Sequence, residues 1–321
     1  MAELPNIQST SQVLHGYAFV ANVSQLIDAS SYTLAPSCDF RRAKQTEINE
    51  LREYLKFLSP APSQFYTNLW EYRLPFQGNL VNLPEQEWRY FVIDFVGSNA
   101  TINGLQDAFN IAPLELEIIF TISHLDNIKT GAPALIWNNL KMFQIFHAAK
   151  NDESFFQNVM VSDLEAVKDI YDMMQRYDHS LIDMNQVVRK FDDIKAIPRN
   201  APLSFLGYFA ILESLLTHSP KPSDPSDSIT RQVIQKIALL ENRWSPKLDY
   251  APFGEKPPKK IWTEMYSVRS ALAHGGEPDF KKKFKALLNY TEALRLVKEC
   301  SKSVARYALK EPQLLLDLKN C

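Results

Sequence analysis

The first part of the chain alternates short runs rich in aromatic and β-branched residues with segments of helical periodicity. Runs of this composition bounded by turn residues predict strands, here Leu14–Val23, Phe65–Leu74 and Trp88–Val96. Apolar residues three or four positions apart predict helices, here Ala43–Leu58, Ile102–Asn110 and Pro113–Ile122. The pattern therefore predicts an α+β domain over residues 1–125.

The rest of the chain has helical periodicity almost throughout. We expect a helical connector over residues 126–160, because the broad apolar face of Ala132–Ala149 could bridge two domains. Ser162 and Glu165 have the spacing of a capping box that opens a helix ending near Tyr177. Further helices are expected at Met184–Ile194, Phe205–His218, Ile229–Asn242, Lys260–His274 and Phe280–Leu309. Residues 161–321 are thus predicted to form an all-α bundle.

One helical stretch, KIWTEMYSVRSALAHGGEP from Lys260 to Pro278, carries residues suited to chemistry. Its apolar stripe consists of Ile261, Met265, Val268 and Leu272. Arg269 and His274 lie off that stripe, roughly 140° apart around the helix axis. The two glycines that follow His274 suit a helix C-cap, so the imidazole should lie in the last turn, where the helix dipole favours its protonated form.

An earlier helix contains a carboxylate in apolar surroundings. Glu213 lies in FLGYFAILESLLTH, among Phe209, Leu212, Leu215 and Leu216. A carboxylate in such a setting requires a cationic partner. The sequence predicts that Glu213 either orients an arginine or has a purely structural role.

The series FAILESLL, ITRQVIQKIALLE and MYSVRSALAHGG resembles the HEPN superfamily, and within it the Apea-like HEPN group, over about Val161 to Leu309. The resemblance implies a helical bundle that forms a homodimer and, in many members, acts as a ribonuclease without metal or cofactor. Arg269 and His274 would be the Arg-x4-6-His motif, and Glu213 the acidic residue of the earlier helix. Ser270 stands where active members often carry Asn, Asp or His.

The function implied by the resemblance is a metal-independent endoribonuclease. His274 would act as general acid or base on the ribose 2′-hydroxyl, and Arg269 would stabilise the charge that develops on phosphorus. One chain offers one imidazole, so a two-fold dimer would supply both an acid and a base. Ser270 favours the alternative, a non-catalytic HEPN module for dimerisation or RNA binding.

The charge distribution is compatible with an RNA partner. Residues 228–310 contain seventeen Lys and Arg against eight Asp and Glu, a net charge of +9, whereas the whole chain has −2. We expect Lys281, Lys282, Lys283 and Tyr266 to contact RNA. The competing interpretation is that KKKFK is only a solvated face.

Location and biological role are further expectations. The chain has no apolar run long enough to span a bilayer, no secretory signal at its start and only three scattered cysteines, which fits the cytoplasm. The resemblance suggests a toxin or effector in bacterial antiphage defence, with a regulatory or antitoxin partner and a sensing or restraining N-terminal domain. Some HEPN toxins are modified at a tyrosine two residues after the motif histidine; Gly276 in that position argues against this mode.

Overall fold

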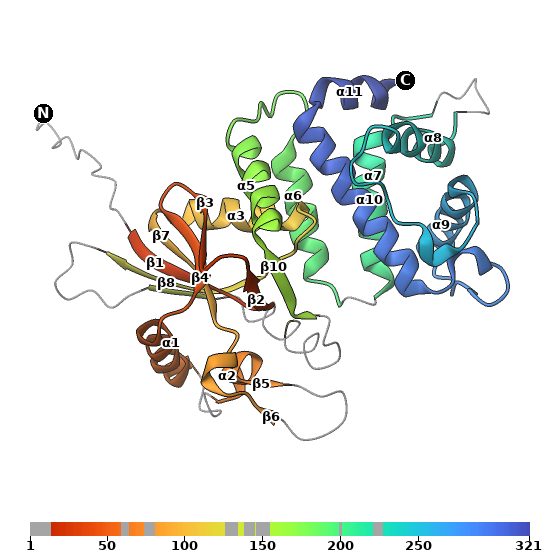
Figure 1. The fold of residues 1–321 in the computed structure, drawn as a ribbon. Helices are drawn as coiled ribbons and strands as arrows, with labels where there is room; N and C mark the ends of the chain where they lie inside the picture. Colours follow the sequence, from red (N-terminus) through yellow and green to blue (C-terminus); the bar gives the residue numbers. More distant parts are fainter. Residues whose placement is uncertain are drawn as a thin grey trace, which may run out of the picture. The chain divides into compact units, whose positions relative to one another are not determined.

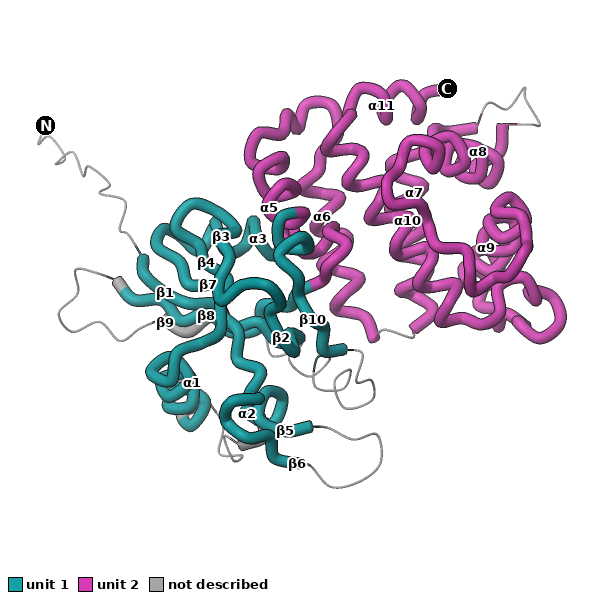
Figure 2. Tube along the Cα trace, viewed as in Figure 1, with its two compact units in different colours: residues 1–106, 116–165 teal, residues 107–115, 166–321 magenta. Residues whose placement is uncertain are grey.

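The computed structural model describes residues 14–58, 64–73, 81–125, 134–137, 145, 155–198, 201–220 and 227–321. The chain forms two compact units, shown in teal and magenta in Figure 2. Unit 1 contains residues 1–106 and 116–165, and unit 2 contains residues 107–115 and 166–321. Unit 1 is rich in strands and unit 2 is helical, so the sheet-rich part precedes the helical part as predicted. The unit boundary lies at residue 165, compared with the expected domain limits at 125 and 160.

Unit 1 is built around a six-stranded antiparallel sheet (Figure 1). The strand order is β3 (Ser31–Ala35), β4 (Cys38–Arg42), β7 (Phe91–Gly97), β1 (Leu14–Val20), β8 (Ile118–Leu125) and β9 (Ala134–Trp137). Two smaller pairings join β2 (Val23–Ile27) with β10 (Gln157–Met160), in parallel, and β5 (Tyr72–Arg73) with β6 (Val81–Asn82).

The core of unit 1 lies between this sheet and two helices, α1 (Gln45–Leu58) and α2 (Gln64–Glu71). Phe19 of β1 and Tyr90 are buried against Trp70 of α2, whose indole N–H donates to the backbone carbonyl of Val20. All five residues from Gly16 to Val20 of β1 are buried, so both faces of the strand are covered there and its second half is apolar.

Several predicted elements of unit 1 are correct and others are wrong. Strands appear within Leu14–Val23 and Trp88–Val96, and helices within Ala43–Leu58 and at Ile102–Asn110, the latter in α3 (Asn99–Ile111). The expected strand over Phe65–Leu74 is mostly helix α2. The expected helix over Pro113–Ile122 does not form: residues 113–117 lie in a loop, and Ile118–Ile122 belong to strand β8.

The connector helix expected over Ala132–Ala149 is wrong near its start. Ala134–Trp137 is strand β9, which pairs with β8. The rest of that segment lies outside the described residues, apart from Ile145, which is helical and buried.

Unit 2 is a group of helices around α7 (Pro202–Leu216). The helices in contact with α7 are α6 (Met184–Lys195), α8 (Ile229–Glu241), α9 (Pro258–Ala273), α10 (Tyr290–Lys310) and α11 (Pro312–Asn320). A helix that is apolar on nearly every side is stable only when it is surrounded, and the sequence PLSFLGYFAILESLL meets this description. Figure 1 shows the green α7 among the blue helices.

The helices expected in unit 2 are confirmed, with differences at their ends. Helix α5 (Val161–Gln175) begins before Ser162, so Ser162 is not its cap. The carboxylate of Asp163, in the first turn, accepts from the N–H of Met160. The helix expected over Phe280–Leu309 begins only at Tyr290, as α10. Before it, Asp279 caps a turn, and a short 3-10 turn, η4 (Lys285–Leu287), follows. Asn289 caps α10 through the N–H of Glu292.

The short segment of residues 107–115 belongs to unit 2 and joins it through a partly buried ion cluster. Glu115 lies 2.6 Å from Nζ of Lys298 and 2.5 Å from Nζ of Lys302 in α10. Lys302 has a fully buried side chain and also donates to the carbonyl of Ala112. Burial lowers the pKa of Lys302 to about 8, an effect that Glu115 partly opposes. Across the described ranges, no helix has both the length and the apolar character needed to cross a membrane.

Candidate active site

The candidate site forms where α9 packs on α7 within unit 2. Phe209 of α7 makes edge-to-face contacts with Trp262 and Tyr266 of α9, at ring-centroid distances of 6.4 Å and 5.7 Å. The indole N–H of Trp262 donates to the hydroxyl of Tyr250, 2.8 Å away. These aromatic contacts fix the face of α9 that carries Tyr266 and Arg269 against α7.

Glu213 of α7 accepts hydrogen bonds from two side chains of α9. Its Oε1 accepts from the hydroxyl of Tyr266 at 3.0 Å, and its Oε2 accepts from Nη2 of Arg269 at 3.0 Å. Tyr266 and Arg269 are three residues apart, so they lie on neighbouring positions of one helix face. The predicted cationic partner of Glu213 is therefore Arg269, and Tyr266 is a second donor to the same carboxylate.

The hydroxyl of Tyr266 remains protonated well into alkaline solution. Burial, together with the charge and hydrogen bond of Glu213, raises the pKa of Tyr266, while Arg269 opposes the shift. The guanidinium of Arg269 also lies 5.7 Å from the centre of the Tyr266 ring. Tyr266 therefore contacts both Glu213 and Arg269, and it is also one of the residues expected to contact RNA.

Arg269 retains hydrogen-bonding capacity beyond the ion pair. Its side chain is 32% exposed, compared with 18% for Glu213. Its Nε is buried and has no hydrogen-bond partner among the described residues. One edge of the guanidinium is fixed by Glu213, and the side chain still reaches solvent, where an anionic oxygen could bind.

His274 lies at the end of α9, in a cap fixed by two glycines. Gly276 N–H donates to the carbonyl of Ala271, and Gly275 N–H donates to that of Leu272, which is the hydrogen-bond pattern of a Schellman motif. Gly275 has a φ of +74°, a conformation that favours glycine. The His274 side chain is exposed and makes no hydrogen bond or ion pair with the described residues.

The remaining predicted residues lie near the same helix end. Ser270 is half-buried, and its carbonyl accepts from the N–H of His274. Lys281, Lys282 and Lys283 are exposed in the turn capped by Asp279. Glu213, Tyr266 and Arg269 therefore form one contact network, while His274 and the lysines face solvent and are not part of it.

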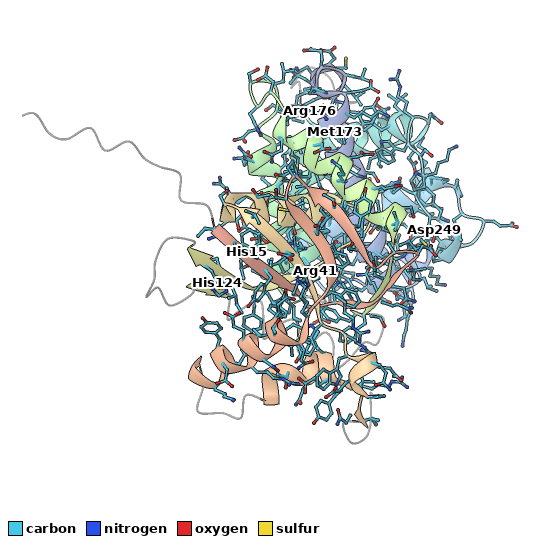
Figure 3. The ribbon with its side chains drawn as sticks, turned by 60° about the vertical axis from the view of Figure 1, so that its left-hand side comes forward. His15, Arg41, His124, Met173, Arg176 and Asp249 are labelled. Carbon is cyan, nitrogen blue, oxygen red and sulfur yellow. The ribbon has the colours of Figure 1, made fainter. Side chains whose placement is uncertain are left out.

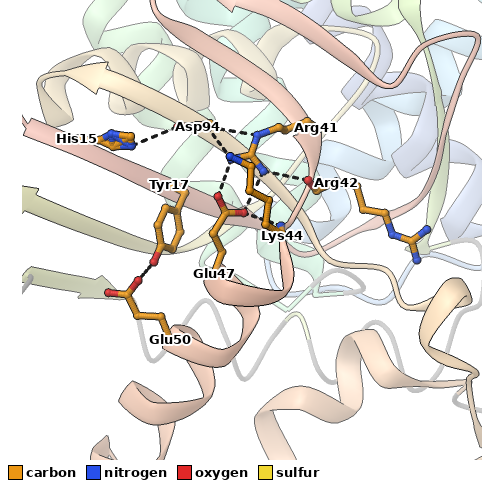
Figure 4. Close-up of polar contacts among 8 residues, drawn as sticks. All are labelled: His15, Tyr17, Arg41, Arg42, Lys44, Glu47, Glu50 and Asp94. Atoms are coloured by element: carbon orange, nitrogen blue, oxygen red, sulfur yellow. Dashed lines mark hydrogen bonds and ion pairs between the residues drawn. The ribbon is translucent and has the colours of Figure 1, made fainter.

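A second polar cluster lies in unit 1, on the sheet face covered by α1 (Figures 3 and 4). Arg41 is 2.6 Å from Glu47 and 2.5 Å from Asp94, and His15 lies 3.8 Å from the same aspartate. The two carboxylates raise the pKa of Arg41, although burial opposes them. This cluster carries no recognisable sequence signal, because its members are scattered over 80 residues.

Next to it, Glu50 of α1 accepts from the hydroxyl of Tyr17 and lies 3.1 Å from Nε2 of His124. Burial raises the pKa of Glu50, and the charge of His124 opposes the shift. His15 and His124 face each other across β1 and β8. In both parts of the cluster each charged group has a partner, so we interpret it as a clamp that fixes α1 on the sheet.

No protein-family model, curated protein or solved structure matches this chain. A function for this chain therefore has to be inferred from the chemistry of its residues and from the HEPN resemblance of its sequence.

Proposed function

We propose that this protein is a metal-independent endoribonuclease of the HEPN type, with Arg269 and His274 as its catalytic residues. The observation that supports this proposal best is the ion pair of Arg269 with Glu213 on the helix whose last turn carries an exposed His274. An arginine fixed by a carboxylate on one edge is oriented before substrate arrives, which favours binding of a phosphate on the other edges.

The proposed reaction uses the ribose of the substrate itself. The imidazole of one His274 removes the proton of the 2′-hydroxyl as the 2′-oxygen attacks phosphorus. The bond from phosphorus to the 5′-oxygen breaks, and a second, protonated imidazole donates its proton to that oxygen. The products are a 2′,3′-cyclic phosphate and a 5′-hydroxyl, and DNA is not cleaved because it lacks the nucleophile.

The second imidazole would come from another copy of the chain. A single protein chain carries one His274, and a two-fold dimer would bring two α9 ends to one phosphate. The exposed turn with Lys281, Lys282 and Lys283 would contact the neighbouring phosphates of the RNA.

Cleavage of total RNA and of tRNA in the presence of a chelator tests the proposal. We expect wild-type protein to cleave RNA, and Arg269→Ala and His274→Ala each to abolish cleavage while the dimer persists in light scattering. Matched controls are Arg176→Ala and His179→Ala, because both residues are exposed and lie on or just after α5, away from α9. Cleavage that survives in His274→Ala would contradict the assignment.

A non-catalytic RNA-binding or dimerisation module is the second candidate. It is favoured by Ser270 after the motif arginine and by the ion pair itself, because Glu213 already neutralises Arg269. This candidate predicts that fluorescence anisotropy detects binding of an RNA oligonucleotide whose length is unchanged after prolonged incubation.

For the biological role, we propose a cytoplasmic toxin or effector of bacterial antiphage defence, restrained or triggered through a partner or through unit 1. Expression should slow growth and protect against phage, and His274→Ala should remove both effects. Growth inhibition that persists in His274→Ala would separate toxicity from the proposed chemistry.

A further inference from the structure

Unit 1 contains a pocket of about 550 Å³, within the range of about 300–1,000 Å³ typical of small-molecule sites. It is lined by β2 and the turn after it, by the ends of β4 and β5, and by the segment leading into β7. All of these elements belong to unit 1. Neither the ribonuclease motif nor the polar clamp of α1 contributes a side chain to it.

The charge of the pocket is positive. Arg42, Arg73 and Arg89 line it, and Glu87 is the acidic residue in its lining. The residues outside 228–310 have a net charge of −11, so the net charge of that part of the chain gives no sign of three arginines around one cavity. Three guanidinium groups around one cavity favour an anionic ligand.

Arg42 is held in position without losing its charge. Its Nη2 donates to the backbone carbonyls of Gln86 at 2.6 Å and Trp88 at 2.7 Å. No carboxylate among the described residues pairs with it, and its Nε and Nη1 make no hydrogen bond there. A guanidinium that is fixed on one side and open on the other is prepared for a phosphate or carboxylate.

Arg73 and Arg89 add charge to the pocket from two other elements of its lining. Arg73 is exposed on β5, and its side chain makes no hydrogen bond or ion pair with the described residues. The guanidinium of Arg89 lies 4.2 Å from the ring centre of Phe156, a contact that orients the group. Arg73 can therefore be replaced without breaking a contact of the folded chain that the structure describes.

The same pocket offers apolar surface beside its arginines. Leu26, Leu83 and Phe91 line it with mostly buried side chains, and Trp88 is fixed there by the hydrogen bond from its indole N–H to the carbonyl of Leu83, 3.0 Å away. A ligand that fits both parts carries a strong anionic group and a flat or apolar group. We propose that this pocket binds a free organic phosphate of nucleotide size.

Calorimetric titration of the full chain with ATP, pyrophosphate and adenosine, in the presence of a chelator, tests the proposal. We expect ATP to bind most tightly, pyrophosphate more weakly, and adenosine not at all up to millimolar concentration. Arg73→Gln and Arg42→Gln should each weaken ATP binding roughly 10- to 100-fold, the loss typical of one charge-assisted hydrogen bond.

Lys56→Gln is the matched control, because it removes one positive charge from an exposed position of unit 1 outside the pocket. His274→Ala should bind ATP as wild type does, so the two proposals can fail separately. Circular dichroism checks the fold of Arg42→Gln. If Arg42→Gln unfolds, ATP binding by Arg73→Gln alone tests the proposal.

Three results would overturn the inference. One is the absence of ATP binding at millimolar concentration, and another is equal weakening by Arg73→Gln and Lys56→Gln. The third is a short RNA oligonucleotide that binds more tightly than ATP and loses affinity in Arg73→Gln, since the pocket would then be part of an RNA surface.

Discussion

Glu213 is the residue on which the candidate active site depends, because two side chains of α9 donate to its two oxygens. Its sequence context predicted a cationic partner but could not say which of many cations would reach it. Tyr266 was expected only as an RNA contact, and its role as a donor to Glu213 could have been inferred from its spacing of three residues from Arg269.

Removing the hydroxyl of Tyr266 tests this arrangement. Tyr266→Phe should lower the free energy of unfolding by about 1 kcal/mol, because one partly buried hydrogen bond is lost. The pKa of Tyr266 is raised above its ordinary value of 10.0, so the bond stabilises the fold below that pH and is lost as pH rises through the folded-state pKa. The difference between the two proteins in urea denaturation should therefore shrink in strongly alkaline buffer.

Tyr54→Phe is the control for that comparison, because Tyr54 has a half-buried side chain and a hydroxyl without a hydrogen bond to the described residues. Equal destabilisation by the two substitutions would argue against a specific role for the bond between Tyr266 and Glu213.

Gly275 fixes the direction in which the chain leaves α9 after His274. At a φ of +74°, Gly275→Ala should lower stability by roughly 1 kcal/mol, and Gly275→Asn by less, because asparagine tolerates this conformation better. Thermal unfolding of the three proteins measures the order. If alanine and asparagine are equally tolerated, the cap does not constrain the helix end.

At the scale of elements, helices with one clear apolar stripe were predictable and short strands were not. The expected helix Ile229–Asn242 matches α8 to within one residue. The aromatic run from Phe65 suggested a strand, but it is helix α2, because burial of Trp70 against Phe19 and Tyr90 outweighs the strand preference of aromatic residues. Strands β2 to β4 have five residues each, too few for their alternation to stand out.

The start of α10 can be read from the sequence. Asn289 followed by Glu292 has the spacing of a helix N-terminus, and the structure starts α10 at this position. The arginines of the unit 1 pocket could not have been grouped from sequence, since Arg42, Arg73 and Arg89 come from separate elements. Only the pairing of those elements in the fold brings them to one cavity.

The packing of α6 on α7 depends on Gly207. A Cβ atom added there would lie 2.6 Å from Cγ1 of Ile194, so the two helices are as close as a glycine allows. Gly207→Ala should lower the free energy of unfolding by about 1–2 kcal/mol in spite of alanine's better helix propensity. In the Gly207→Ala/Ile194→Ala double variant the loss should be smaller than the sum of the single losses. Additive losses in urea denaturation would contradict a direct clash.

At the scale of the whole molecule, Glu115 pairs with the partly exposed Lys298 and the buried Lys302, which ties residues 107–115 to α10. Burial by itself would raise the pKa of Glu115, but Lys298 and Lys302 outweigh it and hold the pKa well below its usual range. Since the folded-state pKa is depressed, this carboxylate stabilises the fold above its ordinary pKa, and the contribution is lost as pH falls.

Glu115→Gln should therefore lower the free energy of unfolding at neutral pH by about 3–5 kcal/mol, because the charge of Lys302 is left buried without its partner. Its stability should also depend less on pH in the acid range than that of the wild type. Glu311→Gln, which removes an exposed ion pair, is the control. The Glu115→Gln/Lys302→Met double variant should recover most of the loss, and failure to do so would point to a general packing defect.

The placement of residues 107–115 has a practical consequence for dissecting the protein. In the sequence these residues interrupt unit 1, but in the fold they belong to unit 2. A single cut anywhere in the chain therefore leaves at least one of the two units without some of its residues. A protein truncated near residue 125, or one that begins near residue 161, would lack residues that one of the two units needs. Separate study of the halves calls for a rearranged gene in which the segment is joined to the helices it supports.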